Sequence, residues 1–340
     1  MNHIAIDLGG RNSQVCVRNG QGEVLREERI ETRSLGRYLQ RAERSRVVME
    51  TCAESLAVAD AALLASHEVR VVPATLVRSL GVGSRRLKTD RRDAQVLSEV
   101  SCRIDLPSVH LRSEASRELQ TRLGMRDRLV ACRTMLINSV RGWLRTQLVR
   151  PHGSTCRTFS KRVRQAVDPM PGYVEVQLET IEALNGQIQK GSDNLKALAE
   201  ENEVVQRLMS VPGVGVLTAL RFFATVDQLD RFSYAHGLQS YVGLTPGEDS
   251  SSETQRRTSI TKAGPGALRW MMVEAAWNAM TFRSHDPMVL WAKGIEKRRG
   301  KRIAVVALAR KMVGILFAIW RDQTVYQPLR AAEAPLSGPK

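Results

Sequence analysis

The spacing of apolar residues changes abruptly near Ser113, and this change constrains the fold more than any other feature of the chain. Before it, short β-rich runs alternate with short amphipathic segments. After it, apolar residues recur at helical spacing over long stretches. The 340 residues are enough for about two domains of ordinary size. We therefore predict an α/β part followed by a mainly helical part.

The first part is predicted to fold as a mixed sheet flanked by helices. Three short β-rich runs separated by glycine-containing turns are typical of a meander. A helix, a strand, a second helix and another strand then follow in order. The predicted strands are 3–7, 14–18, 24–30, 47–49 and 69–72, and the predicted helices are 35–42 and 56–66.

Two long helices are predicted next, at about 119–144 and 181–198, with a loop at 151–158 between them. The second has a near-heptad rhythm of apolar residues. Such a pair forms either an antiparallel coiled-coil arm, which can also serve in dimerisation, or part of an ordinary bundle, and the spacing fits both. We place the parts at 1–112, 113–205 and 206–328, with a disordered tail at 329–340.

The charge of the chain points to a polyanionic partner. Its 51 Lys and Arg residues against 35 Asp and Glu residues give a formal net charge of +16. Cationic side chains that neutralise phosphates release condensed counterions, which favours nucleic acid as the partner. A membrane surface would attract the same charge, but no amphipathic anchor accompanies it. The apolar run Ile303–Ile319 carries Arg310 and Lys311, which are costly in lipid, and is predicted to be a buried helix.

The cysteines and the N-terminus bear on the compartment. The five cysteines are scattered and form no Cys-x-x-Cys pair, which predicts reduced thiols and neither a zinc site nor a disulfide framework. The N-terminal residues lead directly into a predicted strand, without the basic and apolar regions of a secretion signal. A cytoplasmic protein is expected.

Four carboxylates are placed to share one site. Asp7 and Glu50 each end a predicted apolar strand, and the carboxyl ends of neighbouring strands meet at one edge of an α/β sheet. Asp90 and Asp93 begin a predicted helix, and their spacing puts them on one helix face. Four such groups repel one another unless cations bind between them. Two Mg²⁺ ions roughly 4 Å apart would relieve the repulsion and could clamp the attacking and leaving oxygens of phosphoryl transfer.

Three of the four carboxylates also have an ordinary explanation. Asp90 could cap a helix, Asp93 could pair with a surface arginine, and Glu50 could be a plain strand end. The segment 7–12 also resembles the first phosphate loop of actin-like sugar kinases, but we find neither the second phosphate loop nor the adenosine motif of those enzymes. Two acidic strand ends together with an Asp-x-x-Asp helix favour the metal site.

Further candidates lie in the second half of the chain. The serine triplet 250–252 is either a solvated turn or the location of a nucleophile, whose hydroxyl would need activation by a base or a metal. The segment 212–215 is either a tight turn or the hairpin of a helix-hairpin-helix, whose amides bind phosphate. The residues expected to contact nucleic acid are Lys88, Arg91, Arg92, Gly213, Gly215, Arg256, Arg257, Lys262, Lys297, Arg298, Arg299, Lys301 and Arg302.

In order and spacing, these motifs resemble the DEDD transposases of the IS110 type, the Piv/MooV-like recombinases of bacterial insertion sequences. The resemblance extends over nearly the whole chain. It implies an N-terminal RuvC-like domain of the ribonuclease-H-like class, a coiled-coil arm, and a mainly α C-terminal transposase domain with a helix-hairpin-helix-like motif. The segments that carry it are 5–7, 48–51, 88–94, 211–215, 243–246 and 260–264.

The resemblance also implies a mechanism. Asp7, Glu50, Asp90 and Asp93 would bind Mg²⁺, with Mn²⁺ as a substitute, and a serine would link covalently to a DNA strand. In the family this serine lies five residues after the proline of the Gly-Leu-x-Pro segment and precedes a glycine. That position is Ser251 here. Because Ser252 stands in place of the glycine, Ser250 stays a second candidate.

The partners implied by the resemblance are donor DNA, target DNA and a structured guide RNA, the bridge RNA, which pairs with both. Family members also assemble as homodimers or homotetramers, and a nucleoid-associated protein of the bacterial cytoplasm is expected. We therefore predict a Mg²⁺-dependent, RNA-guided recombinase. Two other hypotheses stay open: a RuvC-like junction-resolving nuclease with a structural serine loop, and a non-catalytic nucleic-acid-binding protein.

Overall fold

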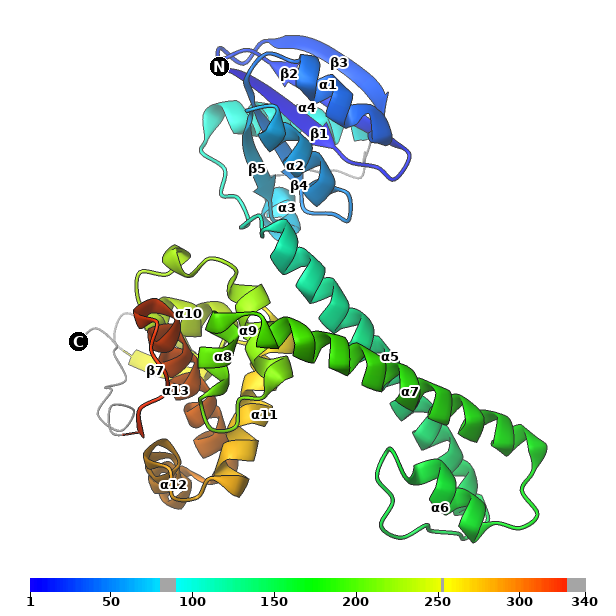
Figure 1. The fold of residues 1–340 in the computed structure, drawn as a ribbon. Helices are drawn as coiled ribbons and strands as arrows, with labels where there is room; N and C mark the ends of the chain where they lie inside the picture. The colour runs from blue at the N-terminus through cyan, green and yellow to red at the C-terminus, as the bar shows by residue number, and fades with distance from the viewer. Residues whose placement is uncertain (80–89, 252–253, 329–340) are drawn as a thin grey trace. The chain divides into compact units, whose positions relative to one another are not determined.

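The chain is organised as two compact units, Met1–Leu111 and Arg112–Lys340 (Figure 1). The computed structural model describes residues 1–79, 90–251 and 254–328. Lys88, one of the predicted nucleic-acid contacts, and the predicted tail at 329–340 lie outside the described residues.

The first unit contains a five-stranded sheet with the strand order β3-β2-β1-β4-β5. The first three strands form an antiparallel meander, and β4 and β5 continue the sheet in parallel with β1. The predicted mixed sheet is confirmed. The strands are β1 (Asn2–Asp7), β2 (Asn12–Arg18), β3 (Val24–Glu31), β4 (Ser45–Glu50) and β5 (Glu68–Val72).

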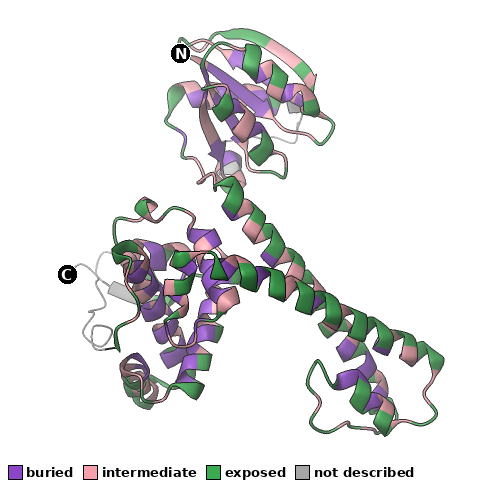
Figure 2. Cartoon of the chain, viewed as in Figure 1, coloured by how far each residue is buried: buried purple, intermediate pink, exposed green. Residues whose placement is uncertain are grey.

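Helices cover both faces of this sheet because the buried residues of its central strands alternate between two clusters. Ile4 and Ile6 of β1 belong to the cluster that includes α1 (Leu35–Arg41) and α2 (Ser55–Leu64). Ala5, which points the other way, belongs to the cluster of α3 (Ala74–Ser79) and α4 (Asp90–Arg103). Burial on both faces explains the continuous apolar runs of β1 and β4 (Figure 2). A 3-10 turn, η1 (Thr32–Ser34), precedes α1.

The second unit begins with the two long helices that the sequence predicts. α5 (Glu114–Thr146) and α7 (Gly172–Glu200) pack lengthwise against each other (Figure 1). A short helix that was not predicted from the sequence, α6 (Phe159–Ala166), lies between them in the chain. Its Phe159 and Val163 complete a small core with residues of α5 and α7. Most other residues along the two long helices are exposed (Figure 2).

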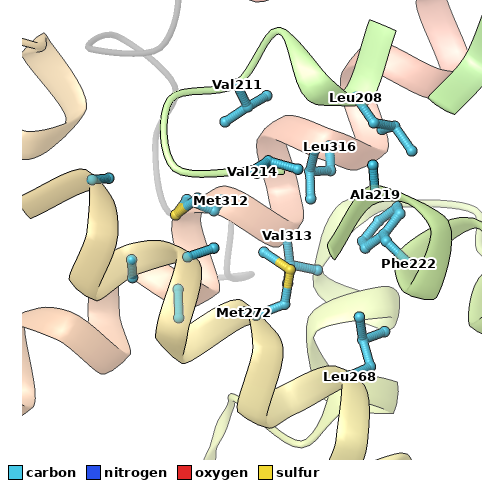
Figure 3. Packing of buried hydrophobic residues seen from close by; sticks show 14 of the residues in the cluster. Leu208, Val211, Val214, Ala219, Phe222, Leu268, Met272, Met312, Val313 and Leu316 are labelled. Atoms are coloured by element: carbon cyan, nitrogen blue, oxygen red, sulfur yellow. The ribbon is translucent and has the colours of Figure 1, made fainter. Parts of the chain in front are cut away.

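A larger core holds the remaining helices together. Side chains from α8, α9, α11 and α13 converge in it (Figure 3), and Leu123 of α5 and Leu195 of α7 also contribute. One end of the long helix pair is therefore built into this core. The elements are α8 (Glu203–Met209), α9 (Val216–Val226), η2 (Leu229–Arg231), α10 (Ala235–Val242), β6 (Pro246–Ser251), β7 (Thr254–Ile260), α11 (Gly266–Phe282), α12 (Pro287–Arg299) and α13 (Lys301–Asp322).

The prediction of a buried helix at 303–319 is confirmed. Within the described ranges, α13 is the one helix long and apolar enough to cross a membrane by length and composition, but more than half of that stretch is buried inside the protein. Arg310 donates from Nε to Oε1 of Gln239 at 3.1 Å. Lys311 is only 6% exposed, and its Nζ lies 4.7 Å from the centre of the Trp291 ring. These contacts accommodate two cations in a helix that serves as core.

Replacing Lys311 with methionine should stabilise the second unit. Burial lowers the pKa of the Lys311 ammonium, which means that its charged form is less stable in the folded chain than in the unfolded chain. Below that pKa, removing the charge removes the cost. We expect a gain of roughly 1 kcal/mol in the free energy of unfolding, or about 2–4 °C in Tm. Thermal unfolding measures the gain, with the exposed Lys190→Met as control. A lower Tm for Lys311→Met would show that the Trp291 contact outweighs the burial cost.

Candidate active site

Two of the predicted carboxylates lie side by side at one edge of the sheet. β1 and β4 are parallel, and their register pairs Ile6 with Met49. Asp7 and Glu50 are the next residues along, at the carboxyl ends of the two strands, and both are half-buried. Neighbouring strands lie about 4.8 Å apart. The backbone therefore presents these two side chains as neighbours.

Both carboxylates belong to the face of the sheet that α4 covers. Ala5 and Val48, two residues before them in each strand, pack in the same cluster as Leu97 of α4. Side chains of a strand alternate between its faces, so residues two apart share a face. Asp7 and Glu50 thus share the α4 face.

The direction of α4 brings Asp93 to the same edge. His3 Nδ1, near the start of β1, shares a 2.8 Å hydrogen bond with Ser101 Oγ, near the end of α4. The distance from Ser101 back to Asp93 is about 12 Å at 1.5 Å per helical residue. From His3 forward to Asp7 it is about 13 Å at 3.3 Å per strand residue. Since Leu97 packs with Ala5 between these points, α4 runs antiparallel to β1 and Asp93 lies level with Asp7.

Asp93 is buried, with 6% of its surface exposed, so the surface ion pair considered from the sequence is wrong. A carboxylate at this depth requires hydrogen bonds or a cation. Asp90 is the first residue of α4, one turn earlier, and its side chain lies outside the described part of the structure. The buried Asp93 and the two strand-end carboxylates thus occupy one edge and one face.

The donor types fit a hard cation, because Mg²⁺ takes oxygen ligands and carboxylates above all. Among the side chains that the structure describes, no three of His, Cys, Asp or Glu come close enough to hold a metal ion as they stand. The structure therefore brings Asp7, Glu50 and Asp93 to the same place without forming a coordination shell. Closing one would need side-chain movement or the carboxylate of Asp90.

The first turn of α4 is docked onto β3 through Glu27. Arg91 donates from Nε to Glu27 Oε2 at 2.7 Å, and both Arg91 and Gln95 make a further short hydrogen bond to the same carboxylate. The hydrogen bonds from Gln95 and Arg91 lower the pKa of Glu27. Because Asp93 lies between these two positions in the helix, the docking sets where its carboxylate stands. Arg91, predicted to contact nucleic acid, here binds Glu27 while most of its side chain stays exposed.

Glu27 could not be identified from the sequence. Its partners are 64 and 68 residues away, and no local pattern distinguishes it from the other acidic residues of β3.

The loops that follow the strand-end carboxylates are also held. Thr32 Oγ1 donates to the Gly9 carbonyl at 2.5 Å, and the Gly9 amide donates to Ser13 Oγ at 3.3 Å. A Cβ at Gly9 would lie 2.4 Å from the Asn12 carbonyl oxygen, so only glycine fits this close approach. After Glu50, the Ala74 amide donates to Thr51 Oγ1 at 3.1 Å.

The serine candidates Ser250 and Ser251 lie in a strand of a β-hairpin. Ser250 and Ser251 end β6, and Ser251 pairs in register with Thr254 of β7. Arg256 and Arg257, two predicted nucleic-acid contacts, belong to β7. The side chains of these serines and arginines lie outside what the structure describes.

The base of the hairpin is interlocked with the helices around it. Gly243 ends α10 at φ +75°, and a Cβ there would lie 2.2 Å from the Ala263 carbonyl oxygen. Gly264 has φ +73°, and a Cβ there would lie 2.0 Å from the Tyr241 carbonyl oxygen. One Arg269 guanidinium nitrogen, Nη1, donates to the carbonyls of Val242 and Ala263 at 3.0 and 2.9 Å. The segments 243–246 and 260–264 therefore form one packed joint.

The glycine turn at 211–215 connects α8 to α9. Packing explains the glycine at position 213 but not the one at position 215. Gly213 has φ +88°, and a Cβ there would lie 2.3 Å from the Ala275 carbonyl oxygen of α11. Val211 and Val214 are buried in the core of Figure 3. Gly215 is the exposed N-cap of α9. Gly213 thus serves packing, and the end of α9 at Gly215 faces solvent.

The other predicted cationic contacts occupy exposed positions. Arg92 lies in α4 and Lys262 follows β7. The basic run 297–302 spans the last turn of α12 and the first turn of α13. Its Lys301 has Nζ 4.9 Å from the centre of the Trp277 ring.

Comparisons with known proteins place the chain among transposases. Residues 4–148 match the family model for the DEDD transposases of IS110, described as "Transposase". Residues 205–288 match the model described as "Transposase IS116/IS110/IS902 family". The transposase for insertion sequence element IS1111A of Coxiella burnetii is 30% identical, over 95% of this chain and 91% of its own length. The transposase for insertion sequence element IS1328 of Yersinia enterocolitica is 24% identical, over 95% of this chain and 98% of its own length.

Replacing Glu27 with glutamine should loosen the first turn of α4. We expect a loss of about 1 kcal/mol in the free energy of unfolding at pH 7, since charge-assisted hydrogen bonds are lost. The folded pKa of Glu27 lies below its ordinary value of 4.5. The wild-type advantage is therefore present above that value and disappears as the pH falls through the lower folded pKa.

Urea unfolding at pH 7 and at progressively lower pH measures the difference between wild type and Glu27→Gln. Glu31→Gln, which removes an exposed carboxylate paired with the exposed Arg33 in the same region, is the control. If the difference in the free energy of unfolding between wild type and Glu27→Gln were constant across this pH range, the lowered pKa of Glu27 would be contradicted.

Proposed function

The chain belongs to the IS110-type DEDD transposases and is a DNA transposase, and we propose that it cuts and rejoins DNA at a metal site formed by Asp7, Glu50, Asp90 and Asp93. One observation carries this proposal: a buried carboxylate of α4 lies level with two adjacent strand-end carboxylates on the same face of the sheet. Such a group of acids is stable only with positive charge between its members.

The fold supports the finer assignments. An antiparallel β3-β2-β1 meander continued by parallel β4 and β5 supports a RuvC-like, ribonuclease-H-like domain. The lengthwise packing of α5 and α7 supports a coiled-coil arm. The pair α8 and α9, joined by a turn with a positive-φ glycine, supports a helix-hairpin-helix-like motif.

The carboxylates would hold the metal ions to which the reacting phosphodiester binds. Bound Mg²⁺, or Mn²⁺ in its place, would supply Lewis-acid stabilisation of negative charge on the phosphoryl oxygens. The hydrogen bonds in the loops after β1 and β4 and the Glu27 contact hold the backbone near these acids, so that side-chain movement would be enough to gather their oxygens. Burial of Asp93 also limits access of bulk water from the α4 side.

Ser251 is proposed as the nucleophile. Its Oγ would form a bond to phosphorus, and the bond from phosphorus to one deoxyribose oxygen would break. The serine proton passes to solvent or a base, and the departing oxygen leaves as a protonated hydroxyl. Attack by a deoxyribose hydroxyl of the other DNA reverses these steps and releases the serine. The energy of the phosphodiester is kept, which makes rejoining possible without another energy source.

The partners follow from the family and from the cationic surface. Donor and target DNA are the substrates, and a structured guide RNA pairs with both. The exposed run 297–302 and the basic residues beside the hairpin suit a phosphate backbone. The carboxylates and the serine hairpin belong to different compact units, which is compatible with a homodimer or homotetramer in which one copy's hairpin serves another copy's carboxylates.

Replacing Ser251 with alanine should abolish covalent protein–DNA products. Ser250→Ala is the matched control, because it removes a neighbouring hydroxyl of the same strand. Adducts are captured by denaturing the reaction, digesting the DNA and locating the phosphorylated peptide by mass spectrometry. Full recombination by Ser251→Ala would remove this residue from the mechanism, and loss with Ser250→Ala alone would move the role to Ser250.

Asp7→Asn, Glu50→Gln and Asp93→Asn should each slow strand cleavage by at least about 100-fold, because each removes a proposed ligand of the metal site. DNA binding should persist, since none of these changes removes a cation. Glu43→Gln, which changes an exposed carboxylate of the same unit, should cleave normally. Cleavage rates at increasing Mg²⁺ measure the effect. Undiminished cleavage by Asp7→Asn would contradict the proposed site.

A further inference from the structure

A pocket rich in arginine lies in the second unit, between α5, α7 and the loop that precedes α6. The function proposed above does not use it. Three of its lining side chains are guanidinium groups, from two different parts of the chain. The lining residues are Arg126, Arg133, Thr155, Cys156, Arg157, Asn185, Ile188, Gln189 and Ser192.

Each of the three arginines is oriented by a hydrogen bond to a neutral side chain of α7. Arg126 donates from Nε to Ser192 Oγ at 2.9 Å. Arg133 donates from Nη1 to Asn185 Oδ1 at 2.9 Å, and Arg157 donates from Nη2 to Gln189 Oε1 at 2.8 Å. The Asn185 amide in turn donates to the Cys156 carbonyl at 3.2 Å, which ties the loop to α7. These hydrogen bonds orient the guanidinium groups without neutralising their positive charge.

The pocket is short of negative charge. None of its lining residues, all within the described part of the chain, is acidic. The carboxylate beside Arg126 is Asp127, 3.8 Å from Arg126 Nη1, and Asp127 also accepts a hydrogen bond from Arg221. Burial and the nearby cations Arg133 and Arg221 lower the pKa of Arg126, against the opposing effect of Asp127. The three guanidinium groups thus give the lining of the pocket an excess of positive charge.

Arg133 also has an unused donor. Its Nε is buried and has no hydrogen-bond partner in the described part of the chain. Nε of Arg46, Arg70, Arg112 and Arg221 share this property elsewhere in the described chain, so the Arg133 donor supports a ligand only together with the pocket that its guanidinium lines. A guanidinium presents its N–H groups in a planar fork that matches the oxygens of a phosphate.

We propose that this pocket binds a phosphodiester group of a nucleic-acid backbone. The proposal rests on the proposed function for the nature of the polyanion, because a transposase handles DNA and, in this family, RNA. The contact would be independent of base sequence and would fix the register of the strand along α5 and α7. It would also tie the loop at 155–157 to both helices, because all three arginines would share one ligand.

The test is the salt dependence of binding. Arg126→Gln, Arg133→Gln and Arg157→Gln would be titrated against fluorescent duplex DNA and against an RNA hairpin of the same stem sequence, without Mg²⁺. Because the three arginines would share one phosphate, each single variant should reduce the slope of log K against log salt concentration by up to about 0.9 on duplex DNA. The nucleic acid whose slope falls is the one that occupies the pocket.

Arg128→Gln is the matched control, because it removes one charge from an exposed position of α5 that does not line the pocket. Its slope should stay close to that of the wild type. Equal effects of Arg128→Gln and the pocket variants, or unchanged slopes on both nucleic acids, would overturn the proposal. If Arg133→Gln does not fold, as judged by circular dichroism, the exposed Arg157→Gln decides.

A result that contradicts the phosphate pocket can be distinguished from one that contradicts the metal site. Asp7→Asn keeps the pocket intact and should bind with the wild-type slope while losing cleavage. If Asp7→Asn cleaves normally but the pocket variants lose slope, the pocket stands and the metal site falls.

Discussion

The parallel pairing of β1 with β4 is the constraint on which the candidate active site depends. It sets the carboxyl ends of two strands at one edge, where Asp7 and Glu50 become neighbours. A slip of one residue in this pairing would send one of the two side chains to the opposite face, because the side-chain period of a strand is two. The burial of Ala5 and Val48 against α4, and of Ile6 and Met49 on the other side, makes such a slip costly.

Opposite charges are used differently in the two units. In the first, Glu27 neutralises Arg91 and thereby positions acidic groups that would otherwise repel one another. In the second, Arg126 and Arg133 of α5 bind neutral hydroxyl and amide oxygens of α7, so their charge stays available. The first arrangement organises a group of acids that needs bound cations. The second leaves guanidinium groups whose charge is not neutralised by a carboxylate in the pocket.

Local pattern predicted the elements whose stability comes from burial. The alternation of the sheet strands, the two long helices and the apolar helix α13 were all predicted from spacing. The hairpin β6–β7 was missed because its strands are short and polar, and its stability comes from the joint at Gly243 and Gly264. Helix α6 was missed because eight residues give little periodicity and its partners lie on α5 and α7.

Contacts between residues far apart in the chain could not be predicted, because local spacing does not show how the elements pack against one another. Four strand-end and helix-start carboxylates are visible in the sequence, but the burial of Asp93 depends on how α4 crosses the sheet. The arginine pocket joins residues as far apart as Arg126 and Ser192, and only their shared groove reveals it. Its members are unremarkable among the 51 Lys and Arg residues of the chain.

The joint beneath the serine hairpin determines how that element can be handled as a module. A two-stranded ribbon alone is marginally stable in water. At the base of this one, the carbonyls of Tyr241 and Ala263 lie so close to Gly264 and Gly243 that no side chain fits there. The position of the two strands is therefore set by the end of α10 and the start of α11. A chimera that exchanged only the two strands between relatives would separate the hairpin from the helix ends that position it. A chimera that exchanged 235–282 as a block would keep the hairpin together with α10 and α11.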